Sequence, residues 1–196
     1  MRLFAALELP EDVVSAIRAQ VEPARALAPQ LRWVSPGQWH VTLAFYGDVP
    51  QGSVDDLTTR LTRAARRVPT FTASIGDPAR FGSARRTRVV WVGLNQGREQ
   101  VSRLAAGARA AGRRAGLVRD DLAADARFRA HITLARVMPP GPVDEVLQAL
   151  DPGSHPAWRA DEVVLVRSEL GSGEGGRARH TVLARAALGS QPREAG

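Results

Sequence analysis

The sequence predicts an α+β protein built as two similar lobes, each with a mostly antiparallel sheet and outer helices, around a central cleft. Apolar runs typical of strands alternate with segments of helical spacing, and several strands are separated only by short, hairpin-like gaps. A strand, a helix and a strand with a His-x-Thr-Leu motif follow one another twice, ending around His40 and around His131. We therefore expect one pseudo-symmetric, bilobal domain over residues 1–188, with residues 189–196 as a disordered tail.

The N-terminal segments predict a strand, a helix and the first motif strand. Residues 2–9 form an apolar run that Pro10 closes, which indicates a strand. Residues 11–27 carry apolar side chains at helical spacing, which indicates a helix. A short extended segment at 31–34 and a Ser-Pro-Gly turn then lead into a strand over 39–46.

The middle of the chain adds two helices and two strands. Residues 54–68 have an apolar stripe and end at a proline, which predicts a helix, and a further helix is predicted over 99–115. Residues 71–75 alternate in polarity and predict a strand, and the apolar run 89–94 predicts a central one. The Gly- and Arg-rich segment 76–88 between these two strands is typical of a loop.

The C-terminal third contains the second motif strand. Its predicted elements are a loop at 122–126, the motif strand over 128–137, a short helix over 143–150, a strand within 158–168, a flexible hairpin tip over 171–176 and a strand over 180–188.

The most informative feature is a short pattern that occurs twice, HVTLA at residues 40–44 and HITLA at residues 131–135. Side chains two residues apart lie on the same face of a strand, so each imidazole shares a face with a threonine hydroxyl. The chain has only four histidines, and two of them begin this pattern. If the two strands lie side by side, two histidines and two threonines meet, which favours acid–base chemistry on an anion.

Composition limits the partners and the location of the protein. The absence of cysteine excludes disulfides, thiolate nucleophiles and cysteine-based zinc sites, and it suits a cytoplasmic protein. The N-terminal apolar run is too short for a signal peptide or a membrane span. The net charge is +7 and all 27 basic residues are arginine, which favours an anionic partner such as RNA but also fits a coding bias.

The paired motifs resemble those of the two-histidine (2H) phosphoesterases. Within that superfamily the chain is similar to the bacterial and archaeal RNA 2′,3′-cyclic phosphodiesterases, also called 2′-5′ RNA ligases. The similar segments are MRLFAALELP, LRWVSPGQWHVTLAFYGDV, RVVWVGL, FRAHITLARV and VVLVRSELGSG. The resemblance implies two α/β lobes around a water-filled cleft and catalysis without a metal or an organic cofactor.

The resemblance also implies the site residues. They are two catalytic histidines, two threonines that hold the phosphate and an arginine that contacts a phosphate oxygen: His40, His131, Thr42, Thr133 and Arg136. Phe45 is a weaker candidate for a base contact, because strand alternation places it on the face opposite His40.

Two positions depart from the family pattern. Ala130 stands where a proline often precedes the second histidine, and His180 stands where the last strand usually begins with an aromatic residue. The second departure puts base stacking there in doubt, and we expect His180 at a solvated strand start, with a place in the lining of the cleft as the alternative.

The implied reaction opens a 2′,3′-cyclic phosphate at an RNA end to leave a 2′-phosphate, with reversible 2′-5′ RNA ligase activity as a further expectation. One imidazole activates water and the other protonates the leaving oxygen, because histidine's ordinary pKa near ~6.5 permits both forms. As a hypothesis, His40 protonates the 3′ oxygen and His131 activates the water, although the symmetry of the motifs leaves the reverse open.

Other functions remain open from the sequence. One is a phosphodiesterase for a small cyclic nucleotide or an ADP-ribose cyclic phosphate, and another is a non-catalytic RNA-binding module. Two histidines alone make a poor zinc site. None of the four aspartates considered as further ligands stands at a recognised spacing from them: Asp48, Asp120, Asp121 and Asp125. The leading expectation is a monomer without metal or membrane attachment that acts on RNA with cyclic phosphate ends, such as tRNA fragments.

Overall fold

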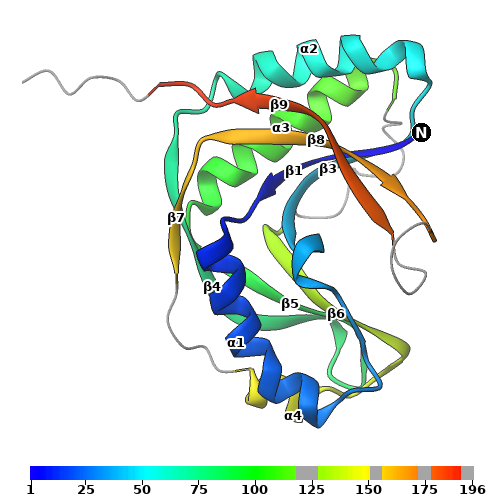
Figure 1. Cartoon of the computed structure of the whole chain (residues 1–196), viewed down its shortest axis with the longest axis vertical. Coiled ribbons are helices and arrows are strands. Elements are labelled where there is room, and N and C mark those ends of the chain that lie inside the picture. The colour runs from blue at the N-terminus through cyan, green and yellow to red at the C-terminus, as the bar shows by residue number, and fades with distance from the viewer. Residues whose placement is uncertain (118–127, 151–155, 172–177, 191–196) are drawn as a thin grey trace, which may run out of the picture.

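The computed structural model describes residues 1–117, 128–150, 156–171 and 178–190 of the chain. Its strands form two antiparallel sheets with helices beside each (Figure 1). The four-stranded sheet has the order β3-β1-β8-β9, and the five-stranded sheet has the order β2-β6-β5-β4-β7. The α+β class and the arrangement in two antiparallel sheets, predicted from the sequence, are confirmed.

The elements have the following bounds. The four-stranded sheet contains β3 (His40–Asp48), β1 (Arg2–Glu8), β8 (Glu162–Glu169) and β9 (Arg179–Ala187). The five-stranded sheet contains β2 (Arg32–Trp33), β6 (His131–Gly141), β5 (Arg86–Gln96), β4 (Phe71–Ser83) and β7 (Ala157–Ala160). The helices are α1 (Glu11–Leu27), α2 (Val54–Ala65), α3 (Arg98–Arg114) and α4 (Asp144–Ala149), with 3₁₀ turns η1 (Pro36–Gln38) and η2 (Gln51–Ser53).

The two faces of the four-stranded sheet have different neighbours. On one face, Leu7 of β1 belongs to the main apolar core, together with Leu61 of α2 and Leu104 of α3. On the other face, Phe4 of β1 and Val164 of β8 belong to a separate small apolar cluster. The helices α2 and α3 therefore cover one side of this sheet, and alternate residues of β1 and β8 point to the opposite side.

The predicted loop over 76–88 is wrong, because β4 and β5 continue through it as a long hairpin that turns at 84–85. The register of this pair is irregular between Ile75 and Pro78, so the proline, which has no N–H to donate, lies where the ladder is interrupted. A Cβ at Gly76 would lie 2.9 Å from the carbonyl carbon of Leu94, so the close approach of the two strands there requires glycine. These signals, which usually mark a loop, here mark a bulged strand.

At the C-terminal end, the strand predicted within 158–168 is confirmed as β8. The short strand β7 before it was not predicted; the two are separated by Asp161 and join different sheets. Gly189, assigned to the tail from sequence, has a backbone N–H that donates to Val68 O at 2.8 Å, and its carbonyl accepts from Thr70 N at 2.9 Å. The predicted loop at 122–126 and the tail from residue 191 lie outside the described residues, as does most of the tip at 171–176.

None of the helices in the described ranges is both long enough and apolar enough to cross a membrane.

Candidate active site

The two motif strands, β3 and β6, belong to different sheets and contact each other. Over their first nine residues they have the same sequence of buried, half-buried and exposed positions. In both, the histidine and the threonine are half-buried, and the apolar residues that follow each of them are buried. The pseudo-symmetry expected from the repeated motif therefore extends to the environment of each side chain.

The strand β3 carries a bulge directly after Thr42. Thr42 pairs with Ala6 of β1 and Ala44 pairs with Ala5, so Leu43 is an extra residue without a partner in β1. A bulge of this kind shifts the alternation of every side chain beyond it. Phe45 consequently stands opposite Phe4.

The bulge changes the expected position of Phe45. Its ring lies 5.8 Å from the Phe4 ring, which in turn stacks on His40. Phe45 is therefore on the face that carries the histidine, and the sequence-based assignment to the opposite face is wrong. The side chain is 65% exposed, which is unusual for a large apolar residue and leaves the ring available to a ligand.

The strand β6 has a matching bulge after Thr133. Thr133 pairs with Trp91 of β5 and Ala135 pairs with Val90, which leaves Leu134 as the extra residue. Beyond it, Arg136 is exposed and its positive charge acts on the imidazole of His131. The bulge therefore brings the arginine to the histidine side of β6.

His40 is held by a hydrogen bond to the backbone and by contact with an aromatic ring. Its Nδ1 lies 2.7 Å from the carbonyl oxygen of Gln38. Because a carbonyl can only accept, Nδ1 carries the proton and Nε2 of the neutral ring is left as an acceptor. The ring stacks on Phe4 of the neighbouring strand, with centroids 4.8 Å apart and an interplanar angle of 26°.

His131 is held in the same way from the other sheet. Its Nδ1 lies 2.8 Å from the carbonyl oxygen of Arg129, again two residues earlier in the chain. Phe81 meets the imidazole edge-on at 4.9 Å, and Trp91 lies 5.8 Å away. Both histidines therefore present Nε2 as the free nitrogen, which is the arrangement a general base needs.

Burial keeps both imidazoles neutral at neutral pH. Burial, followed by the charge of His180, lowers the pKa of His40 to about 4, and a smaller effect comes from His131. Burial also lowers the pKa of His131, and the charge of Arg136 adds to this effect. Because the charge of His131 contributes to the low pKa of His40, the imidazole from the other sheet lies within electrostatic range of this ring.

His180 is the residue that the sequence analysis placed wrongly. It lies near the start of β9, and its ring is 5.5 Å from that of His40 and 5.1 Å from that of Phe4. Burial lowers the pKa of His180 as well. The position is therefore part of the histidine site and not a solvated strand start. The available signal was the family pattern, which has an aromatic residue at this position.

Three aromatic neighbours of the catalytic candidates were also missed. The sequence predicted Phe4 and Trp91 to lie in apolar strands and Phe81 to lie in a loop, and only the pairing of strands shows which histidine each one contacts. Within the described ranges no group of three or more His, Asp or Glu side chains is placed to hold a metal ion. Asp120, Asp121 and Asp125 lie outside those ranges.

Comparison with known proteins identifies relatives over most of the chain. The RNA 2′,3′-cyclic phosphodiesterase of Thermus thermophilus is 35% identical over 178 residues, which cover 87% of this chain and 83% of the relative. The protein of the same name from Escherichia coli is 32% identical over 175 residues, covering 88% and 89%.

The fold is found in solved structures of similar sequence. The crystal structure of TT0787 of Thermus thermophilus matches with a TM-score of 0.80 at 30% identity, covering 98% of this chain and all of that one. Escherichia coli LigT complexed with 3′-AMP matches with a TM-score of 0.70 at 30% identity, covering 95% and 97%. Residues 13–172 match the model of the 2′-5′ RNA ligase superfamily, and the chain belongs to that superfamily.

Proposed function

We propose that this protein hydrolyses the 2′,3′-cyclic phosphate at an RNA end to a 2′-phosphate, with His40 and His131 as the general acid and base. The observation that carries the proposal is the matched pair of imidazoles on two contacting strands, each with Nδ1 bonded to the carbonyl two residues earlier. Recognition of RNA alone would not require two histidines held with the same free nitrogen. The activity named for the similar Thermus and Escherichia proteins supports the same reaction.

The cyclic phosphate needs a base on one side of phosphorus and an acid on the other. His131 activates the water, His40 protonates the leaving 3′ oxygen, and in the ligase direction the two roles reverse. Thr42 and Thr133 donate hydrogen bonds to the non-bridging oxygens, where negative charge increases in the transition state. Arg136 adds a charge-assisted contact to the same phosphate.

The low pKa of His40 makes the anionic substrate part of the acid–base cycle. With a pKa of about 4, His40 is neutral before the substrate binds and has no proton to give. A phosphate anion beside the ring favours the charged form and raises the pKa. The substrate therefore brings His40 into the protonated state in which it can act as the acid.

The test is product analysis on an RNA oligonucleotide that ends in a 2′,3′-cyclic phosphate, in the presence of EDTA. The wild type is expected to form a 2′-phosphate, and His40→Ala and His131→Ala are each expected to lower kcat by ~10²–10⁴-fold, the usual contribution of general acid–base catalysis. Circular dichroism of each variant checks that the fold is intact. A 3′-phosphate product, or full activity in either variant, would contradict the mechanism.

The same assay on a mononucleotide 2′,3′-cyclic phosphate compares the RNA substrate with the small-nucleotide alternative. A similar structure, that of LigT, is complexed with 3′-AMP, so a nucleotide-sized ligand suits this fold. We expect the oligonucleotide to have the higher kcat/KM. We also infer that the protein works as a cytoplasmic monomer on RNA fragments such as those of tRNA, which suits a cysteine-free, basic chain.

A further inference from the structure

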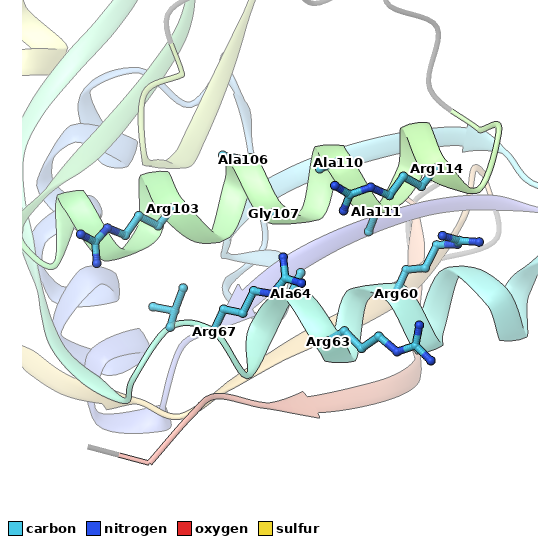
Figure 2. Close-up of a pocket in the computed structure, with 11 residues that line it drawn as sticks. Arg60, Arg63, Ala64, Arg67, Arg103, Ala106, Gly107, Ala110, Ala111 and Arg114 are labelled. Atoms are coloured by element: carbon cyan, nitrogen blue, oxygen red, sulfur yellow. The ribbon is translucent and has the colours of Figure 1, made fainter. Parts of the chain in front are cut away.

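A groove lined by arginines runs between α2 and α3. It has a volume of about 600 Å³ and is lined by Arg60, Arg63 and Arg67 on the α2 side and by Arg103 and Arg114 on α3. Figure 2 shows these side chains extending around the groove from α2, from the segment that directly follows α2 and from α3. No acidic residue is among the lining residues described.

Small residues form the floor of this arginine groove. Ala64 of α2 faces Ala106, Gly107 and Ala110 of α3. A Cβ added at Gly107 would lie 3.2 Å from the Cβ of Ala64, so the helices approach each other closely at this point. Because the floor residues are short and the rim residues long, the helix pair leaves a trough with guanidinium groups along both sides.

The charge of the groove is only partly compensated. Arg60 forms an ion pair with Asp56 at 2.8 Å, and Arg103 forms one with Glu99 at 3.1 Å. Both acidic partners stand one helical turn before their arginine, outside the groove. Such exposed pairs contribute little to stability and leave the guanidinium available to a second anion.

Arg63, Arg67 and Arg114 are exposed, and none of them has an acidic partner within ion-pair distance in the described ranges. The distribution of charge also separates this surface from the general arginine bias of the chain. Residues 54–68 and 98–114 together contain nine arginines and three acidic residues. These three positive charges lie around one trough and have no acidic side chain of the described ranges as a partner. An external polyanion that binds there would therefore stabilise this surface.

The groove lies on the side of the four-stranded sheet opposite to the histidines. Tyr46 of β3 donates a hydrogen bond from its hydroxyl to Ala108 O of α3 at 3.1 Å, so α3 packs against the face that points away from His40. The edge strand β9 joins the two sides, because α2 packs against it and its His180 lies beside His40. A sheet and a helix layer together are about 20 Å thick, so a dinucleotide bound at the histidines is too short to reach the groove.

We propose that the arginine groove binds the sugar–phosphate backbone of the RNA substrate, away from the reacting end. The proposal rests on the proposed function for its substrate class and adds a second contact region for long RNA. Guanidinium forks suit phosphate oxygens, and an RNA strand presents phosphates in a row, as the rims of the groove present arginines. A trough open to solvent and floored by alanine and glycine offers little to enclose a compact ligand, which favours a strand over a small anion.

The test compares two double variants with equal loss of charge. Arg67→Gln/Arg114→Gln removes one uncompensated guanidinium from each side of the groove, and Arg18→Gln/Arg25→Gln removes two exposed ones from α1. Binding is measured by fluorescence anisotropy on an RNA of about 20 nucleotides with a 3′-hydroxyl, over a series of salt concentrations. Hydrolysis is measured on the same RNA and on a dinucleotide, both with a 2′,3′-cyclic phosphate end.

The groove variant is expected to bind the long RNA several-fold more weakly. The slope of log K against log salt is expected to become shallower by about 1.4, which is about 0.7 for each lost phosphate contact to a single strand. KM for the long RNA rises, whereas kcat on both substrates and KM for the dinucleotide stay unchanged. Arg67→Lys/Arg114→Lys, which keeps the charge, restores most of the binding.

Three outcomes would overturn the proposal. One is an equal loss of RNA affinity in the α1 variant, which would mean that the weaker binding follows from the lower net charge alone. Another is an equal rise in KM for the dinucleotide, which would indicate damage to the histidine site. The third is that the groove binds inorganic tripolyphosphate but not RNA. In that case tripolyphosphate raises the Tm of the wild type and not that of the groove variant, while both proteins bind RNA equally well. Because the binding arm uses RNA that cannot be hydrolysed, a failure of the proposed reaction would not be mistaken for a failure of the groove.

Discussion

Phe45 and Arg136 occupy equivalent positions in the two motif strands, five residues after His40 and His131, and a bulge after each motif threonine turns both toward the histidine side. The lobes are therefore alike in histidine, threonine and bulge but differ at this position. One lobe offers an exposed ring and the other a guanidinium. The two histidines proposed as acid and base have matching surroundings in the two strands, whereas the side chains available to hold a nucleotide differ.

Arg136 is expected to contact the phosphate and also to influence His131. Arg136→Gln removes a charge-assisted hydrogen bond, so kcat/KM on a cyclic-phosphate RNA is expected to fall by ~10–100-fold, corresponding to about 1.5–3 kcal/mol. Burial is the larger cause of the low pKa of His131, but the positive charge of Arg136 adds to it, so the pKa should rise in the variant. NMR titration of the imidazole measures this shift, and an unchanged pKa with unchanged kcat/KM would contradict both roles.

Phe45 is expected to stack on a base of the substrate. Phe45→Ala should raise KM by ~5–100-fold with little change in kcat, because stacking on an aromatic side chain contributes about 1–3 kcal/mol per base and takes no part in proton transfer. Leu27→Ala is the matched control, since Leu27 is also an exposed apolar residue but belongs to α1. Steady-state kinetics on a dinucleotide distinguish the two, and a fall in kcat alone would argue against stacking.

The two threonines are expected to stabilise the transition state. Thr42→Val and Thr133→Val keep the β-branched shape of half-buried strand residues and remove only the hydroxyl. Each is expected to lower kcat by ~10²–10³-fold, the usual loss when one oxyanion donor is removed. Single-turnover rates with saturating enzyme measure the chemical step, and a loss confined to KM would place the hydroxyls in ground-state binding instead.

Local pattern was sufficient to predict most of the elements, whereas the convergence of the two motifs was expected from the family resemblance. The alternation around His40 and His131 predicted their strands, because a half-buried strand repeats every two residues. The bulges were not predictable, because Leu43 and Leu134 are apolar like their neighbours. Only the register with β1 and β5 shows that they are extra.

The remaining errors have the same physical origin, since they depend on which strands pair. His180 reaches His40 through the pairing of β9 with β8 and of β8 with β1. The short strand β7 was not predicted, because it is defined by its pairing with β4 in the sheet that does not contain β8. Gly76 and Pro78 read as a loop because the sequence does not show a partner strand that tolerates a bulge.

The burial of His40 should make the stability of the fold depend on pH. The pKa is about 4 in the folded protein against an ordinary value of 6.5, so the unfolded chain takes up this proton more readily. The contribution of neutral His40 is therefore complete above pH 6.5 and is lost as the pH falls toward 4. At about pH 5 the loss amounts to about 2 kcal/mol, and His40→Gln, which cannot be protonated, should not show it.

Urea unfolding of both proteins at about pH 8 and about pH 5 measures the difference. The free energy of unfolding of the wild type should fall more than that of the variant. The variant should keep a smaller pH dependence, because burial also lowers the pKa values of His131 and His180. An equal loss in the two proteins would mean that His40 is protonated in the folded state at an ordinary pKa, and the requirement for substrate to charge it would then disappear.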